Sequence, residues 1–374
     1  MNTRLQVEHP VTECVTGYDL VEWQLQVAAG DPLPARQEDV RLTGHAIEAR
    51  LYVEDPYSGF APQTGTVLWW KPEAAVQGGV ESGRIASGVR IDHGIREGAV
   101  VSPFYDPMVA KVIVHGRDRT DAIRRLRAAL AQAPLLGLKN NGRFLSDLVD
   151  HPAFRKAEMT TTLIDQWLDA GEALLTAPVA DDDAWRVAAI AFASQHGDSW
   201  RANSVSAYGF NLRCGEQTRA VRVRPDHAGG VSVTLDGATE AARVLSYVDG
   251  ALRFALHGVQ QSAVALIAGA QVHLAWRGHS FVFEELSPFP SADALQDASR
   301  ALSPVAGKVT HVPVAAGDPV AEGQQLVCVE AMKMEMWLCA QAGGTVKALH
   351  AKAGDQVESG ALLVELDINP TKES

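Results

Sequence analysis

A 37-residue internal repeat constrains the fold of this chain more than any other feature of its sequence. The matching segments are 307–309 (GKV) with 344–346 (GTV), 317–320 (GDPV) with 354–357 (GDQV), Gly323 with Gly360, and 326–327 (LV) with 363–364 (LV). A tandem duplication of one unit explains the constant offset. Because glycine occupies the expected turns, each unit is predicted to hold short strands. Two facing units would form a small β sandwich with pseudo-twofold symmetry.

The segment between the halves, 330–336 (EAMKMEM), becomes a hairpin at one end of that sandwich if the halves are related by symmetry. Lys333 would then occupy an exposed tip. One interpretation is that the methionines pack into a core and that Lys333 is an ordinary solvated charge. The other is that an exposed lysine at a rigid turn serves a modifying enzyme or carries a prosthetic group. The position alone leaves both interpretations open.

Stretches rich in Ala, Ser, Pro and Asp divide the rest of the chain. The predicted units are 1–172, 183–286 and 301–368, with a linker at 287–300. In the first unit, helical patterns (19–29, from 120 or 121 onward, and 144–149) and strand-like runs (46–53 and 108–115) predict an α+β fold. In the second, a helical pattern at 185–194 precedes alternating strands and tight turns, which predicts an antiparallel sheet or barrel.

Charge and composition exclude several classes of function. The chain has 33 Lys and Arg against 45 Asp and Glu, a net charge of −12, which argues against nucleic acid as a partner. The longest charge-free apolar run, 262–276, is 15 residues, shorter than the ~20 that a membrane-spanning helix needs. The start has no apolar signal sequence, and the four cysteines form no CxxC pair, so a reducing cytoplasm is expected. Cys328 and Cys339 are accordingly expected as thiols.

The N-terminal segment 2–13 has the alternating pattern of a strand. Arg4, Gln6 and Glu8 are spaced by two, so they are predicted to project from one face. An arginine fork, an amide and a carboxylate suit a small oxyanion that must lose a proton, with Glu8 as base. An exposed polar strand face would look the same.

Residues 330–334 (EAMKM) resemble the biotinyl-lysine motif of biotin carboxyl carrier domains, and the duplicated unit resembles their flattened β barrel. The resemblance implies biotin attached to Lys333 by a biotin protein ligase. The flanking motif residues are Glu330, Ala331, Met332 and Met334. Lipoyl domains share the fold but usually place Asp before the lysine, so the resemblance favours biotin. The even repeat leaves no room for an inserted thumb loop, which points to carriers of multidomain acyl-CoA carboxylases.

The N-terminal segment resembles the biotin carboxylase signature of ATP-grasp enzymes. The resemblance implies that Arg4, Gln6 and the backbone of Val7 hold bicarbonate and that Glu8 is the general base. It places Asn2 near the metal–nucleotide site.

Two further segments carry the same resemblance. Residues 44–50 (GHAIEAR) resemble the family segment whose arginine, here Arg50, stabilises the biotin enolate. Asp106, in 104–108 (FYDPM), matches an acidic position that would orient Arg50 and biotin. The alternative for Asp106 is a turn residue before Pro107.

In that family a metal-binding glutamate and the glycine-rich ATP lid precede the position of Met1. We therefore expect the chain to be the C-terminal portion of a longer α subunit, lacking the ATP-grasp N-terminal region and inactive alone. As written it would act as a carrier and docking module.

The resemblance as a whole implies a ligase. Biotin is carboxylated with ATP, Mg²⁺ or Mn²⁺ and bicarbonate, and is then delivered to a carboxyltransferase β subunit that binds the acyl-CoA, within a hetero-oligomer. The middle unit resembles the domain that docks this subunit. Segments 102–108 (SPFYDPM) and 151–154 (HPAF), with Leu145, look most like methylcrotonyl- or geranyl-CoA carboxylase. Propionyl- and acetyl-CoA carboxylases are the alternatives.

Overall fold

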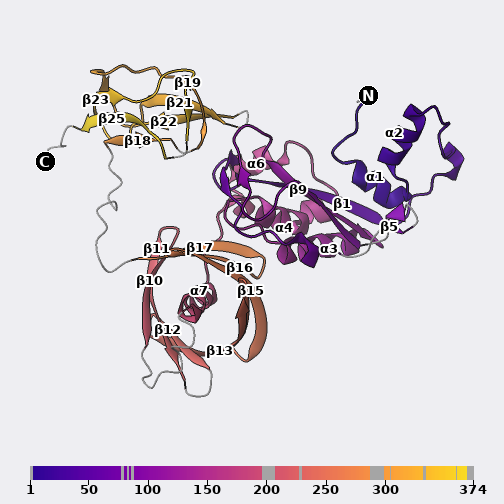
Figure 1. Cartoon of the computed structure of the whole chain (residues 1–374), viewed down its shortest axis with the longest axis horizontal. Helices are drawn as coiled ribbons and strands as arrows, with labels where there is room; N and C mark the ends of the chain where they lie inside the picture. The colour runs from indigo at the N-terminus through magenta and orange to yellow at the C-terminus, as the bar shows by residue number, and fades with distance from the viewer. Residues whose placement is uncertain are drawn as a thin grey trace.

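The computed structural model describes residues 3–76, 80–81, 84–85, 88–195, 207–226, 230–286, 299–303, 305–331, 334–358 and 360–368. Three folded units follow one another along the chain (Figure 1): a mixed helix and sheet unit, a closed barrel around a helix, and a small all-β unit. This confirms the expected fold class. No helix within the described ranges combines the length and the apolar character needed to cross a bilayer.

The first unit is built on an antiparallel sheet in the order β1-β9-β7. Its strands are β1 (His45–Tyr52), β7 (Gly88–His93) and β9 (Met108–Gly116). The pairs of short strands are β2 (Glu54–Asp55) with β3 (Ala61–Pro62), β4 (Gly65–Thr66) with β8 (Val100–Val101), and β5 (Val80–Glu81) with β6 (Arg84–Ile85). The 3₁₀ turns are η1 (Gln37–Asp39), η2 (Pro72–Ala74) and η3 (Ala173–Leu175).

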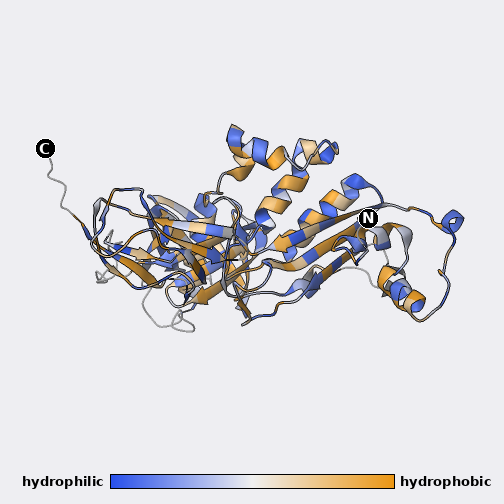
Figure 2. Ribbon diagram, turned by 90° about the horizontal axis from the view of Figure 1, so that it is seen from above, coloured by the Kyte–Doolittle hydropathy of each residue, from blue (hydrophilic) through white to orange (hydrophobic). Residues whose placement is uncertain are grey.

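The helices of this unit are α1 (His9–Thr16), α2 (Leu20–Ala28), α3 (Arg119–Gln132), α4 (Gly142–Asp150), α5 (Pro152–Arg155) and α6 (Leu163–Ala170). Helix α3 begins where the Asp118 carboxylate accepts the Asp121 backbone N–H, a cap typical of helix starts. It buries Ile123 and Leu126 against the sheet. Its exposed side is polar, and Figure 2 shows such mixed polar and apolar ribbons throughout the chain.

The predicted N-terminal strand is wrong. Among the described residues, 3–8 contain no strand, and helix α1 begins directly afterwards at His9. Pro10 lies in the first turn of α1, where a missing backbone N–H leaves no helical bond unmade, whereas it would break a strand ladder. Alternation of polar and apolar residues was therefore a misleading signal next to a proline.

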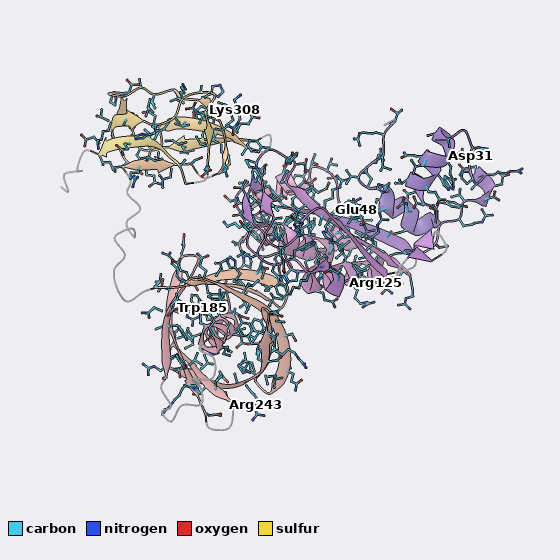
Figure 3. All side chains as sticks on the ribbon, in the orientation of Figure 1. Asp31, Glu48, Arg125, Trp185, Arg243 and Lys308 are labelled. Carbon is cyan, nitrogen blue, oxygen red and sulfur yellow. The ribbon has the colours of Figure 1, made fainter. Side chains whose placement is uncertain are left out.

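The second unit is a closed barrel of consecutive antiparallel strands around helix α7 (Asp182–Ser194). The strands are β10 (Tyr208–Cys214), β11 (Gln217–Pro225), β12 (Val231–Leu235), β13 (Ala238–Val248), β14 (Ala251–Leu256), β15 (Val259–Ala268), β16 (Gln271–Trp276) and β17 (His279–Glu285). Helix α7 lies inside the ring of strands (Figure 1), and its residues 184–193 are all buried. Trp185 points into this interior (Figure 3) and meets Phe283 edge-on, with ring centroids 5.0 Å apart.

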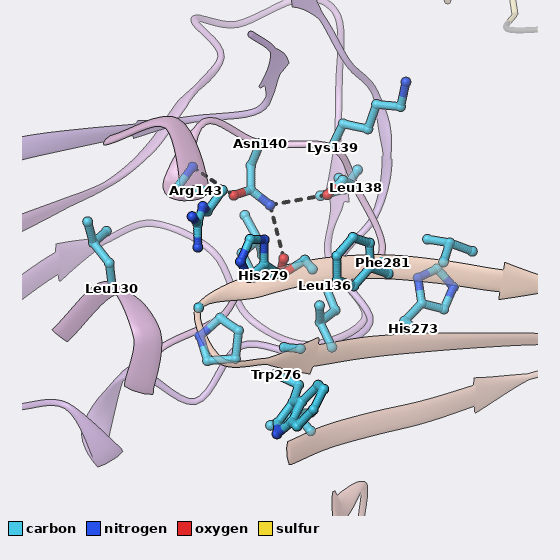
Figure 4. A pocket seen from close by; sticks show the side chains of 18 of the residues that line it. Leu130, Leu136, Leu138, Lys139, Asn140, Arg143, His273, Trp276, His279 and Phe281 are labelled. Carbon is cyan, nitrogen blue, oxygen red and sulfur yellow. Dashed lines mark hydrogen bonds between the residues drawn. The ribbon is translucent and has the colours of Figure 1, made fainter. Parts of the chain in front are cut away.

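The first unit packs against the outside of this barrel. Trp69 and Leu136 form an apolar contact with Ala275 of β16. Next to this contact lies a cavity of about 970 Å³, between the segment 130–143 and strands β16 and β17. Figure 4 shows its leucine, histidine and aromatic lining, with the Asn140 side-chain amide donating to the backbone carbonyls of Leu135 and Leu138.

The third unit consists of two facing sheets, in the orders β18-β25-β23-β20 and β22-β21-β19-β24. The strands are β18 (Arg300–Leu302), β19 (Gly307–His311), β20 (Pro319–Val320), β21 (Gln325–Ala331), β22 (Met334–Cys339), β23 (Gly344–Leu349), β24 (Gln356–Val357) and β25 (Leu362–Ile368). A shift of 37 residues converts one strand order into the other. The predicted duplication and pseudo-twofold sandwich are confirmed.

Close packing of neighbouring strands explains why both halves of the repeat have a glycine at one equivalent position, Gly307 and Gly344. A Cβ atom on Gly307 would lie 2.4 Å from the Glu330 carbonyl oxygen, and one on Gly344 would lie 2.4 Å from the Asp367 carbonyl oxygen. Both positions therefore require the absence of a side chain so that neighbouring strands can approach.

We expect Gly344→Ala to destabilise the third unit by about 1–3 kcal/mol, because the neighbouring backbone must move to admit the methyl group. Gly343→Ala is the matched control, since its Cβ would find its nearest neighbour at 3.7 Å. Native-state hydrogen exchange of the β23 and β25 amides in the full chain measures the difference. Equal protection in the two variants would contradict the close approach.

Candidate functional site

The central residues of the site lie in one row across the first sheet. Arg50 of β1 is paired in register with Lys111 of β9, which is paired with Asp92 of β7. The Lys111 ammonium lies 3.5 Å from the Asp92 carboxylate and is largely buried. Two cations directly opposite each other would repel, so this row needs anions close by.

Glu8 supplies one such anion from outside the sheet. Its carboxylate lies 2.8 Å from the Arg50 guanidinium, although 42 residues separate the two in sequence. Both side chains are partly exposed, 54% for Glu8 and 38% for Arg50. An ion pair this exposed contributes only ~0–1 kcal/mol, so a bound anion can replace Glu8 beside Arg50 at little cost.

Glu48 supplies the second anion from within the sheet. It lies two residues before Arg50 on β1, and its carboxylate is 3.5 Å from the Arg50 guanidinium. The side chain is 4% exposed, and Oε2 has no hydrogen-bond partner among the described residues. Burial raises the pKa of Glu48 above its ordinary value, and nearby Lys111 and Arg50 oppose that shift. Arg50 therefore contacts two carboxylates, the buried Glu48 on its own strand and the exposed Glu8 from the N-terminal segment.

The N-terminal segment is fastened over this row by its backbone. The Lys111 ammonium donates to the Val7 carbonyl oxygen at 3.1 Å, and the Gln6 carbonyl oxygen lies 2.7 Å from His9 Nδ1. Gln6 and Val7 are half-buried, whereas Arg4 is exposed and bonds only to its neighbour's carbonyl in the described part of the chain. Asn2 lies outside the described residues.

A buried carboxylate on helix α1, that of Glu13, connects this helix to the first sheet. Glu13 is 3% exposed; one oxygen accepts from the Leu20 N–H and the other lies 3.1 Å from the Arg90 guanidinium. Arg90 in turn forms a two-pronged contact with Asp92. This chain of contacts ties α1, and hence Glu8 at its start, to the same sheet row.

Asp106 lies in an exposed loop before β9. Its carboxylate accepts the Met108 backbone N–H at 3.0 Å, as the turn alternative implies. Asp106 also lines a cavity of about 430 Å³ that Glu330 and Lys308 of the third unit share. Lys308 lies on the edge of the third unit that faces the first unit (Figure 3). The loop and the biotin-motif strand thus lie on two sides of one space.

The expected attachment motif lies at a hairpin of the third unit. Strand β21 ends at Ala331, β22 begins at Met334, and these two residues are register partners. Ala331 is buried in the core of the unit, and Glu330 is exposed. Met332 and Lys333 lie outside the described residues. All four cysteines are free; of the two expected as thiols in this unit, Cys328 is buried and Cys339 is exposed.

Sequence reasoning missed Lys111, Glu48 and Arg90. A signal was present for Lys111, because one lysine interrupts the apolar run 108–115. Glu48 likewise lies in the middle of a strand in which Ile47, Ala49 and Leu51 are buried. The contacts of Lys111 with Val7 and Arg50 join segments that are distant in the sequence, and the sequence does not specify such contacts locally.

Comparison with known families agrees with this geometry. Three family descriptions match: "Carbamoyl-phosphate synthase L chain, ATP binding domain" over 1–36, "Biotin carboxylase C-terminal domain" over 48–166, and "Biotin-requiring enzyme" over 301–366. The first covers the segment with Glu8, the second contains Glu48, Arg50 and Lys111, and the third contains the hairpin.

Individual proteins match over nearly the whole chain. The propionyl-CoA carboxylase alpha chain of Ruegeria pomeroyi is 35% identical over 98% of this chain and 58% of its own length. The mitochondrial methylcrotonoyl-CoA carboxylase subunit alpha of Mus musculus is 34% identical over 98% of this chain and 53% of its own. The solved biotin carboxylase domain of Hydrogenobacter thermophilus 2-oxoglutarate carboxylase is 36% identical, covering 48% of this chain and 36% of that one, with a TM-score of 0.42.

The chain thus spans little more than half the length of the curated relatives it matches. Within that span it holds both the biotin carboxylase C-terminal match and the biotin-requiring match. The chain therefore carries a match to the biotin carboxylase C-terminal domain and a match to the biotin-requiring domain, and over nearly its whole length it is similar to acyl-CoA carboxylase alpha chains.

Proposed function

We propose that this chain carries biotin on Lys333 and presents it to two places: the Arg50 site of its first unit and a carboxyltransferase β subunit docked on its barrel. The observation that carries the proposal is the joining, in one chain, of the Glu8–Arg50 pair and the β21–β22 hairpin. Each lies within a segment that matches a biotin-dependent family.

The third unit fits covalent biotin by its construction. Strands β21 and β22 are paired as far as Ala331 and Met334, the residues that precede and follow Met332 and Lys333 in the sequence. The Lys333 amine attacks the carbonyl carbon of biotinyl-adenylate, an amide bond forms, and AMP leaves. Once attached, biotin supplies a ureido nitrogen that accepts a carboxyl group at one site and releases it at another.

The first unit provides charges suited to that chemistry. Arg50 donates guanidinium N–H groups to negative charge that develops on an oxygen of the bound group. Glu8, released from Arg50, accepts a proton as general base. Glu48, fixed in the sheet, keeps Arg50 aimed at the site while Glu8 is displaced. Arg4, Gln6 and the Val7 backbone N–H are the proposed bicarbonate ligands.

For the longer proteins that this chain resembles, the proposal also includes a nucleotide reaction. ATP and Mg²⁺ or Mn²⁺ would activate bicarbonate there, with Asn2 near the metal. For Asp106 we propose a role in orienting biotin from the cavity that it shares with Glu330.

For the acyl group we propose the methylcrotonyl or geranyl class, on the segments 102–108 and 151–154. Relatives named for propionyl-CoA and for methylcrotonoyl-CoA match at similar identity, so propionyl-CoA is the alternative. The β subunit that the barrel binds distinguishes the two.

We expect Lys333→Arg to abolish biotinylation, because a guanidinium keeps the charge but is not a usable nucleophile. Coexpression with a biotin ligase, followed by streptavidin blotting, measures this. Lys308→Arg and Lys347→Arg, both on strands of the same unit, are the controls and should keep the full signal. A retained signal in Lys333→Arg would refute the assignment.

We also expect a methylcrotonoyl-class β subunit to slow hydrogen exchange in strands β10–β17 of the intact chain, with little change in the first sheet. A propionyl-class β subunit serves as the comparison and should protect less at equal concentration. Protection confined to the first or third unit would overturn the docking role of the barrel. Stronger protection by the propionyl-class subunit would reverse the acyl-group assignment.

A further inference from the structure

A histidine, a cysteine and a glutamate meet on the outer surface of the third unit, apart from the row of Arg50, Lys111 and Asp92 in the first unit. They come from neighbouring strands in the order β22-β21-β19. His311 and Trp337 are the register partners of Cys328 on its two sides. Glu335 lies two residues before Trp337, so it shares the same sheet face.

This face is the outer one. Val327 and Val329 belong to the core of the unit, and Cys328 between them does not, so its thiol points away from the core. Cys328 is nevertheless fully buried. The rings of His311 and Trp337 stack with centroids 5.9 Å apart, and because they flank Cys328 they cover its thiol.

The three donor atoms are close enough to share one ion. A ring nitrogen of His311, the Cys328 sulfur and a carboxylate oxygen of Glu335 all lie within 4.8 Å of one another. Tetrahedral zinc bonds of ~2.0–2.3 Å place ligands roughly 3.3–3.8 Å apart. His311 and Glu335 are exposed, so rotation about their side-chain bonds can shorten the distances between the three donor atoms while Cys328 stays in place.

The duplicated half provides an internal comparison. At the positions equivalent to His311 and Cys328, 37 residues later, the chain has Ala348 and Glu365, which are also register partners. The fold therefore does not require a histidine and a cysteine at these positions. Within the residues that the structure describes, this donor set is found in the half that contains β21 and β22 and is not found at the equivalent positions of the other half.

We propose that His311, Cys328 and Glu335 bind a divalent cation of the zinc class, with the fourth position open to solvent. Thiolate, imidazole and carboxylate ligands together favour Zn²⁺ over Mg²⁺ or Ca²⁺. Bound metal would tie the start of β22, two residues after Lys333, to β19 and stiffen the hairpin. The site is independent of the proposed function, since it requires neither biotin nor a partner subunit.

Titration of the reduced, chelator-treated full chain with Co²⁺ tests the proposal. We expect one equivalent to give tetrahedral visible bands and a thiolate-to-cobalt charge-transfer band, both lost when Zn²⁺ is added. Cys328→Ser should remove the charge-transfer band. His311→Ala and Glu335→Gln, at exposed positions that the fold tolerates, should each weaken binding by at least about tenfold.

Cys339→Ser and His350→Ala are the matched controls, since both residues are exposed in the same unit and neither belongs to the cluster. Both variants should bind cobalt as the parent chain does. Absence of a charge-transfer band in the parent chain, or its persistence in Cys328→Ser, would overturn the proposal. So would unchanged affinity in both His311→Ala and Glu335→Gln.

Discussion

The fold of the third unit depends on the close approach of β19 to β21 at Gly307. The Glu330 carbonyl occupies the space of a missing side chain, which fixes the register of the two strands. Strand β21 continues to Ala331, which is paired in turn with Met334 at the start of β22. Gly344 repeats the contact in the other half, so both sheets are aligned by the same device. Lys333, the lysine proposed to carry biotin, comes two residues after the end of β21 in the sequence.

The row of Arg50, Lys111 and Asp92 across the first sheet depends on the balance of charges. Arg50 and Lys111 are opposed across two strands and are balanced by carboxylates from three directions: Glu8, Glu48 and Asp92. The buried members are fixed, whereas the Glu8–Arg50 contact is exposed and easily exchanged. A rigid base with one replaceable anion is the arrangement expected of a site that accepts and releases a charged group.

The sequence predicted most of the local structure and little of the long-range contact. The repeat gave the sandwich, because each half carries its own turns and spacing. The alternating strands predicted a sheet or barrel, but the burial of α7 inside it required knowing that the strands close. The predicted strand through Arg4 and Glu8 was wrong, since Pro10 favours a helix start. The sequence predicts site roles for both Glu8 and Arg50, but their contact follows from tertiary structure alone.

The central claim is that strand register, rather than lysine chemistry alone, selects the site of modification. Exchanging neighbours, in the double variant Met332→Lys with Lys333→Met, keeps the composition and moves the amine by one residue. The direct measurement is the initial rate of biotinylation by a biotin ligase, located by peptide mass spectrometry. The account predicts modification of the parent chain at Lys333 and none in the exchanged variant. Modification of the shifted lysine at a comparable rate would contradict it.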